Sequence, residues 1–576
     1  MMIQITDVWA LMRRHGLFML VLALSVPIKI MTAHNLPWDI DIVPVVARNT
    51  DYLLTPVGTL SSVAAYNLPM LSWLHLPAQW LTGNVWWTIM LTMLGFNLLS
   101  TTALYALGLA MFDRRVALIG ATLFTFSEVG VSSSYTAWAQ LLLPGFFAMT
   151  FLCLWLWIDR QRGVWLALAG IVATMAFMTH FSALLLYPAM LVIALLTRAK
   201  WQWRWLLVGA GAVFLMFLPY LRVQIERDFA DVRAFARQQV LVDADVMAQY
   251  EIYKPGYRSQ PAREPLNPPE SIEQVTEDLS EAGAIESLPD VRPEPPPHWQ
   301  RALDYAWQSP RWYWQALTYA FKISTPTLST TFPILAPMLT LFYGMREVLM
   351  LLCIGAVSLQ VIRQRQHPAV LTCTPAGRWL LLLIANLTII TLMILTRTIN
   401  NSSYWTGLMS LQFLMIAYST TLLPHRRTVT VGLLLVMIAY MGLQSGERVL
   451  RIMQHDDDSF SPYNIAIYRH VEATVDYIAQ DWQGGDAVTI NYDIIEDANY
   501  LWWVPAWHSI DPSYRMGMNF DFLLSYHHGI ENRNLEPLGR TEPADYIIVY
   551  TPSLDQYDLT QYSSARFGSI VVLKPH

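Results

Sequence analysis

Charged residues are scarce in this chain of 576 residues. Asp, Glu, Lys and Arg make up 14% of it, against roughly 25% in a soluble domain, while 54% is hydrophobic. Long charge-free runs suit the interior of a bilayer, where an isolated charge is costly. The deficit argues against an ordinary soluble protein and predicts an integral membrane protein.

Cysteine is also scarce, and the net charge is small. Cys153, Cys353 and Cys373 lie in two apolar segments and a basic loop, so their spacing indicates neither a disulfide framework nor a zinc site. The net charge of −6 gives no reason to expect a nucleic-acid partner. We expect no metal ion held by a cysteine or histidine cluster.

Apolar runs that approach the roughly 20 residues of a membrane span are abundant. Arg13 and Arg14 precede the first run as they would in a signal peptide, but its length and the lack of a small-residue cleavage site favour a retained helix. We predict a mainly α-helical, polytopic protein with about 11 spans. The runs are 16–33, 85–112, 116–132, 137–158, 164–179, 181–197, 204–222, 337–362, 379–396, 405–423 and 428–445.

Basic residues orient these spans, because cytoplasmic loops are enriched in Lys and Arg. They fall in every second loop, which predicts a cytoplasmic N-terminus and an outer C-terminal segment in the plasma membrane. Splitting 329–362 at Arg346 and Glu347 would invert the later basic loops, so we reject that division. The groups are Arg13 and Arg14; Arg114 and Arg115; Arg160 and Arg162; Arg198, Lys200 and Arg204; Arg363, Arg365 and Arg378; Arg426 and Arg427.

Four parts follow from this layout. Residues 1–222 form an N-terminal membrane module whose first outer loop, 34–84, contains an amphipathic stretch typical of a helix lying on a membrane surface. Residues 223–332 form an acidic, proline-rich outer loop that we expect to be partly disordered. Residues 333–445 carry the last spans. Residues 446–576 predict a small extracytoplasmic α/β domain, with a helix at 463–482 and strands at 486–492, 545–550 and 569–573.

An acidic pair, Asp39 and Asp41, follows the first span in the sequence WDIDIVP. Two solvated loop acids at a helix end would be an ordinary feature. A carboxylate at the bilayer surface can instead act as a general base toward an acceptor hydroxyl, or hold a cation. The pair alone does not decide between these interpretations.

The surrounding pattern narrows the choice. YNLPMLSWLHLPAQWLTGN follows the acidic pair, and MFDRRVALIGATLFTF and GVWLALAGIVATMAFMTHFSALLLYP come later in the same order. Over about residues 16–222 the chain resembles the GT-C superfamily of polyprenyl-phosphate-sugar glycosyltransferases, in its protein-mannosyltransferase-like and aminoarabinose-transferase-like branch. Three motifs carry the resemblance: Asn67-Leu68-Pro69, Phe112-Asp113-Arg114-Arg115-Val116-Ala117-Leu118 and Met178-Thr179-His180.

The resemblance implies sugar transfer outside the membrane, with the carboxylate of Asp39 or Asp41 as the catalytic base or as the group that positions the acceptor. The chain departs from the family in three places. Ile40 separates the two acids, Gln140 stands where relatives often have an acid, and His180 stands where a lysine is common. Glu128 could replace the missing acid or be an exposed loop residue. His180 could contact a phosphate when protonated or be a packed interfacial side chain.

A donor phosphate also requires positive charge near the outer leaflet. Lys29, Arg346 and Arg397 are the main candidates, alongside His180; Arg48 and Lys322 are weaker ones. Arg346 interrupts an apolar stretch, where an unpaired charge is costly. Arg397 ends the ninth span, where it could also extend its charge to the interface.

We therefore expect a membrane glycosyltransferase that uses a polyprenyl-phosphate-sugar donor and a protein, lipid or glycan acceptor, among membrane lipids. No cofactor is certain, and a divalent cation is compatible with the acidic pair. The altered motifs leave open a catalytically inactive scaffold that binds lipid or assembles into a larger membrane complex. A transporter is disfavoured, because the apolar runs contain few ionisable residues.

Overall fold

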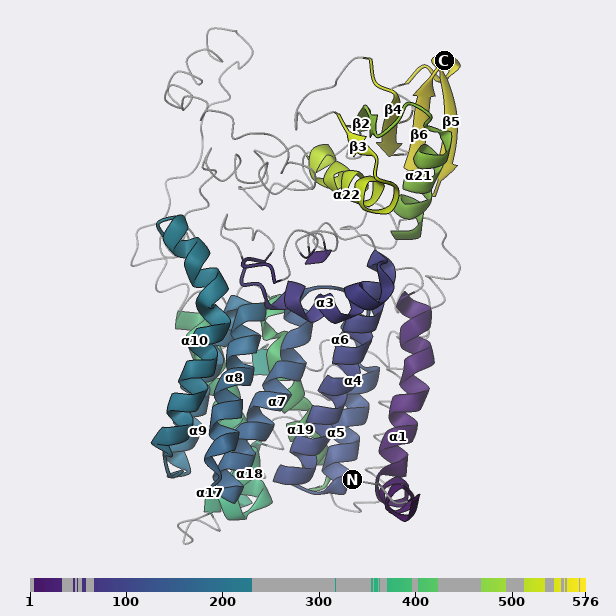
Figure 1. Ribbon diagram of the computed structural model, residues 1–576. Helices are drawn as coiled ribbons and strands as arrows, with labels where there is room; N and C mark the ends of the chain where they lie inside the picture. The colour runs from purple at the N-terminus through teal and green to yellow at the C-terminus, as the bar shows by residue number, and fades with distance from the viewer. Residues whose placement is uncertain are drawn as a thin grey trace, which may run out of the picture.

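The structure is a computed structural model that describes part of the chain. The described residues are 5–33, 45–46, 49, 54–58, 67–229, 316–317, 354–355, 357–360, 362, 370–395, 402–422, 468–493, 512–533, 543–550, 554, 557–568 and 570–576. They form a bundle of apolar helices and, beyond one end of the bundle, a small α/β unit (Figure 1).

Long apolar helices make up the bundle. Within the described residues, five helices are long and apolar enough to cross a membrane: α1, α4, α7, α10 and α18. Two shorter apolar stretches, α8 and η1–α9, stand beside them. The bounds are α1 Ile5–Ala33, α4 Val85–Met111, α5 Arg114–Phe126, α6 Glu128–Ser132, α7 Ala139–Arg160, α8 Gly163–Thr179, η1 Phe181–Leu185, α9 Leu186–Leu196, α10 Trp203–Glu226, α17 Val370–Cys373, α18 Pro375–Leu395, η6 Ser402–Leu408 and α19 Met409–Thr420.

Most of the expected spans in the described residues correspond to helices. The run predicted at 116–132 differs, because it is divided into α5 and α6 at Ser127. The Ser127 hydroxyl accepts from the Gly130 amide (3.0 Å) and donates to the Phe124 carbonyl (2.7 Å), which caps one helix and begins the next. The predicted spans 337–362 and 428–445 lie mostly or wholly outside the described residues, so the count of about 11 stays a prediction.

Helix α3, Met70–Thr82, lies across the ends of the bundle helices (Figure 1). It is the helix expected from the amphipathic stretch of the first outer loop. Pro69, the last residue of one family-like motif, is its N-cap, and Gly83 ends it in the left-handed conformation (φ 59°). Trp80 and Leu81 are exposed by 67% and 83%, so the C-terminal turn presents apolar surface outward.

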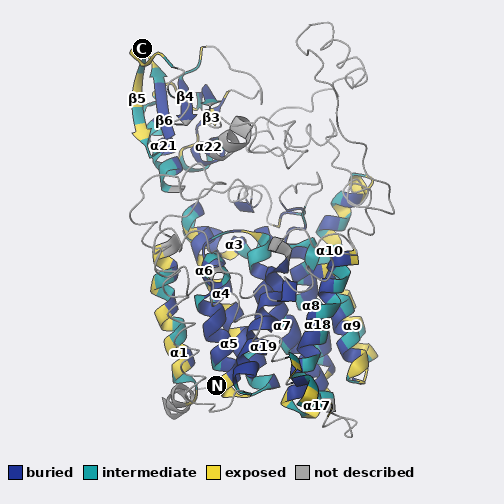
Figure 2. Cartoon of the chain, turned by 180° about the vertical axis from the view of Figure 1, so that it is seen from behind, coloured by how far each residue is buried: buried dark blue, intermediate teal, exposed yellow. Residues whose placement is uncertain are grey.

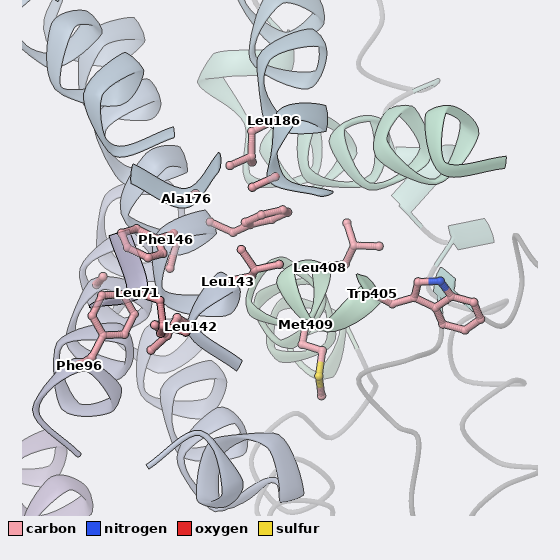
Figure 3. Packing of buried hydrophobic residues seen from close by; sticks show 14 of the residues in the cluster. Leu71, Phe96, Leu142, Leu143, Phe146, Ala176, Leu186, Trp405, Leu408 and Met409 are labelled. Atoms are coloured by element: carbon pink, nitrogen blue, oxygen red, sulfur yellow. The ribbon is translucent and has the colours of Figure 1, made fainter. Parts of the chain in front are cut away.

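The core joins segments that are far apart in sequence. Leu71 of α3, Phe96 of α4 and Phe146 of α7 pack in the same buried cluster as Leu408 and Met409 of the later segment (Figure 3). The inner helices are mostly buried, whereas α1 is exposed along its outer side (Figure 2). Such a distribution is expected of helices whose outer faces meet lipid.

The α/β unit contains the elements predicted near the C-terminus, together with one more helix and two more strands, β3 and β5. The predicted helix is α21, Tyr468–Asp481, and the three predicted strand runs contain β1–β2, β4 and β6; the additional helix is α22, Pro512–His528. The main sheet has the order β2-β4-β6-β5, with β2 parallel to β4 and the other pairs antiparallel. A separate parallel pair joins β1 and β3. The strands are β1 Ala487–Val488, β2 Ile490–Asp493, β3 Glu531–Asn532, β4 Tyr546–Tyr550, β5 Tyr562–Phe567 and β6 Ile570–Pro575.

A polar contact links this unit to the bundle. The Asn84 side chain caps α4 by accepting from the Trp87 amide (3.1 Å), and its Nδ2 donates to Glu472 Oε1 on α21 (3.3 Å). The unit therefore lies at the same end of the bundle as α3 (Figure 1).

At the opposite end, the family-like turn that contains Asp113 has a structural role. Its Oδ1 accepts from the Arg115 and Val116 amides (2.8 and 2.9 Å), so Asp113 is the N-cap of α5. Arg378 Nη1 donates to the Met111 carbonyl (2.7 Å), which fixes α18 beside the same turn. The motif found in the sequence thus holds α4, α5 and α18 together at this end of the bundle.

Close packing of α4 on α5 depends on Gly108. A Cβ atom there would lie 2.6 Å from the Ala117 Cα atom. We expect Gly108→Ala to lower the free energy of unfolding by about 1–3 kcal/mol, because the two backbones must separate. Thermal unfolding in detergent measures this loss. Gly95→Ala in the same helix is the matched control: its Cβ meets open space, and no loss is expected. Equal effects of the two substitutions would contradict the argument.

Candidate functional site

Lys29, a predicted phosphate ligand, is a buried cation near the C-terminal end of α1. Its side chain is 1% exposed, and its Nζ donates to Asn97 Oδ1 of α4. Because most neighbouring α1 side chains face outward, this bond is a polar attachment of α1 to the bundle. The ammonium has three N–H groups and can donate to more than one acceptor. Because the side chain is buried, any further acceptor must lie inside the protein.

Asn97 is held in a single orientation. Its Nδ2 donates to the Gly130 carbonyl and to Ser133 Oγ, both at 2.7 Å, so its Oδ1 must face Lys29. A side chain at position 130 is excluded, since a Cβ atom would lie 1.7 Å from the Phe124 carbonyl oxygen. Helix α6 and its C-cap Ser133 therefore fix the Asn97 oxygen that binds the lysine.

His180 and Gln140, two of the three departures from the family, are in direct contact. The Gln140 amide group and His180 Nε2 are 3.2 Å apart. The Ser182 backbone amide donates to His180 Nδ1 (3.2 Å), and the Ser182 hydroxyl is 2.8 Å from the same atom. Since a backbone N–H can only donate, Nδ1 is an acceptor, and the neutral ring carries its proton on Nε2. The Gln140 amide must then be turned so that Oε1, rather than the nitrogen, faces His180.

The Gln140–His180 contact lies where three parts of the chain meet. Gln140 is in the first turn of α7, His180 is the C-cap of α8, and Thr406 of η6 donates to the Gln140 carbonyl (2.7 Å). If an acid stood at position 140 and a lysine at position 180, as the resemblance implies, the two side chains would form an ion pair. This chain has a neutral hydrogen bond instead, so the His180 ring is used for structure in this arrangement.

The remaining predicted site residues are not placed. Asp39, Asp41, Arg346 and Arg397 lie outside the described residues. Glu128 begins α6, but its side chain is also outside them. The structure therefore places Lys29 and His180 toward the end of the bundle that carries α3 (Figure 1).

The sequence reading missed Asn97, although a signal was available. Asn97 stands within the apolar run of α4, and a buried polar side chain in such a run requires hydrogen-bond partners. Ser133 and Thr406 gave no comparable signal, because short hydroxyl side chains are common in membrane helices. In the described residues, no group of three or more His, Cys, Asp or Glu side chains is placed to hold a metal ion.

Comparisons with known proteins identify the fold. The family model for dolichyl-phosphate-mannose-protein mannosyltransferase matches residues 66–222, from just before α3 to within α10. No curated protein matches the chain. The structure is similar to ArnT from Cupriavidus metallidurans bound to undecaprenyl phosphate, with a TM-score of 0.51 and 10% identity over 97% of this chain and 98% of that one.

Two further solved structures are also similar to this chain. The apo state of the same ArnT has a TM-score of 0.48 at 10% identity, over 97% of this chain and 98% of that one. The oligosaccharyltransferase AglB from Archaeoglobus fulgidus, in complex with an inhibitory peptide and a dolichol-phosphate, has a TM-score of 0.39 at 12% identity, over 98% of this chain and 75% of that one. The resemblance to GT-C proteins that the sequence predicted is confirmed, and the chain is an integral membrane protein with that fold.

Proposed function

We propose that this chain with the GT-C fold transfers a sugar from a polyprenyl-phosphate donor to an acceptor on the outer side of the membrane. One observation carries the proposal. The mannosyltransferase family model matches the helices that hold Lys29's partner Asn97 and the Gln140–His180 contact, within a fold shared with a protein that binds undecaprenyl phosphate.

The chemistry requires a base, a cation and a fixed acceptor. The acceptor oxygen or nitrogen attacks carbon 1 of the donor sugar, the bond from carbon 1 to the phosphate oxygen breaks, and polyprenyl phosphate leaves with the electron pair. Asp39 or Asp41 takes the proton from the acceptor. Cationic side chains stabilise the negative charge that grows on the phosphate, and Lys29 is the candidate among the described residues.

A second function is favoured by the Gln140–His180 contact. A neutral pair at positions where the family resemblance implies an acid and a lysine is compatible with a scaffold that has lost catalysis and kept lipid binding. Such a protein would act as an assembly subunit of a larger membrane complex.

The two functions are separated by an assay of the purified full-length chain in nanodiscs. It is incubated with polyprenyl-phosphate sugars labelled in the sugar, together with a membrane extract as the acceptor source. Label that moves from the lipid to the extract is expected of the transferase. Binding of the lipid with no transfer from any donor, with and without added Mg²⁺ or Mn²⁺, would overturn it and favour the scaffold.

A further inference from the structure

The buried side of α3, together with the adjacent Asn49, carries a row of polar atoms that lack a hydrogen-bond partner among the described residues. Ser72 Oγ, His75 Nε2, Gln79 Oε1 and Asn49 Oδ1 are all buried and make no hydrogen bond to the part of the chain that the structure describes. Their residues are 0%, 0%, 8% and 7% exposed, respectively. Buried polar atoms in native proteins nearly always have a partner, so four such atoms in one row require either bound water or a ligand.

The direction of three of these side chains is fixed by carbonyl groups. Asn49 Nδ2 donates to the Ser72 carbonyl (2.8 Å), Gln79 Nε2 to the Val46 carbonyl (3.3 Å) and His75 Nδ1 to the Leu71 carbonyl (2.7 Å). A carbonyl oxygen can only accept, so each nitrogen must be the donor. The two amide oxygens and His75 Nε2 are therefore acceptors, and turning an amide around would not satisfy them.

These atoms share one face of the helix. Ser72, His75 and Gln79 are spaced at i, i+3 and i+7, which places them along one side over about 10 Å of helix rise. The bond from Asn49 to the Ser72 carbonyl brings its amide to the start of the row. Burial also lowers the pKa of His75 to about 4, against a smaller opposing effect of its bond to Leu71, so the ring is neutral near pH 7.

The row selects the chemistry of its ligand. Three acceptors and one hydroxyl require a ligand with several hydrogen-bond donors. None of the four groups carries a negative charge, so an ammonium ion would lose its hydration without gaining an ionic partner. One imidazole with two amides is not a zinc site. Neighbouring hydroxyl groups, as on a sugar, match both the number and the neutrality of the acceptors.

We infer that the polar row of α3, formed by Asn49, Ser72, His75 and Gln79, binds sugar hydroxyls. The inference rests on the proposed function and assigns the α3 face to the carbohydrate. Val46 and Asn49 are each joined to α3 by a side-chain hydrogen bond, and these contacts must separate for a ligand to reach the buried row. The hydroxyls belong to the donor sugar or to a glycan acceptor, and the experiment separates these sources.

The test measures binding to the full-length protein in nanodiscs. Polyprenyl phosphate with and without its sugar is compared for wild type, His75→Phe and Gln79→Met; Ser72→Ala removes a single hydroxyl and is the mildest change. If the row binds the donor sugar, each variant should bind the sugar-bearing lipid at least 10-fold more weakly and the bare lipid unchanged. Trp80→Phe, on the exposed face of α3, is the control and should change neither affinity.

Two further readouts complete the test. An unchanged donor affinity with a KM for a glycan acceptor raised at least 10-fold also supports the inference and assigns the row to the acceptor. Unchanged binding of both the donor and the acceptor, with only the melting temperature altered, would mean that water fills the row and would overturn the inference.

Binding of methyl glycosides of mannose and arabinose, measured by saturation-transfer NMR, tests sugar binding without catalysis. If wild type binds these sugars and His75→Phe does not, the row stands even where no transfer occurs, and only the proposed transferase function fails. The inference fails if wild type does not bind the methyl glycosides and binds the sugar-bearing lipid no more tightly than the bare lipid.

Discussion

Asp39→Asn or Asp41→Asn should reduce sugar transfer by at least 100-fold while leaving lipid binding intact. General-base catalysis contributes on the order of 10²–10⁴ in rate, and an amide cannot take a proton from the acceptor. The loss should therefore appear in kcat rather than in the KM for the donor. Single-turnover transfer from a labelled polyprenyl-phosphate sugar measures it directly.

The two aspartates are distinguished by comparing their variants. Alternate residues of an extended chain point to the same side, whereas residues i and i+2 of a helix diverge by about 200°. Equal losses indicate that both carboxylates face the reacting atoms, and a loss in one variant identifies the base. Asp113→Asn is the matched control, because Asn also caps helices and Asp113 lies at the opposite end of the bundle. Full transfer by both Asp39→Asn and Asp41→Asn would refute the assignment.

The sequence predicted the elements better than the contacts between them. Apolar runs locate helices well, since a span must satisfy its backbone internally, and α4 and α8 agree with their predicted ranges to within one residue. The break at Ser127 was missed because it depends on a hydroxyl that competes with the helix, and apolar periodicity does not register that competition.

The candidate site shows the same limit. Lys29 and His180 could be selected from the sequence as cations near the outer ends of helices, but their partners come from residues 68 and 40 positions away, Asn97 and Gln140. A single sequence contains no record of such pairings. The contact between Gln140 and His180 also changes their interpretation: two independent departures become one replacement of an expected ion pair by a neutral bond.

Asn97→Leu should lower the free energy of unfolding by about 3 kcal/mol, since a buried ammonium ion would lose its amide acceptor. The Gly130 carbonyl and Ser133 hydroxyl would lose a donor as well. Chemical denaturation of the protein in detergent measures the change. Thr102→Val, at an exposed position of the same helix, is the control and should change stability little.

The double variant Lys29→Met/Asn97→Leu separates structure from function. Replacing both partners with apolar groups of similar size removes the buried charge, so much of the lost stability should return. If Lys29 also stabilises the leaving phosphate, transfer should stay low in this stable double variant, because the positive charge is absent. Restored stability together with restored transfer would make Lys29 only an attachment of α1. Additive losses of stability would show that the two side chains are not coupled as their hydrogen bond implies.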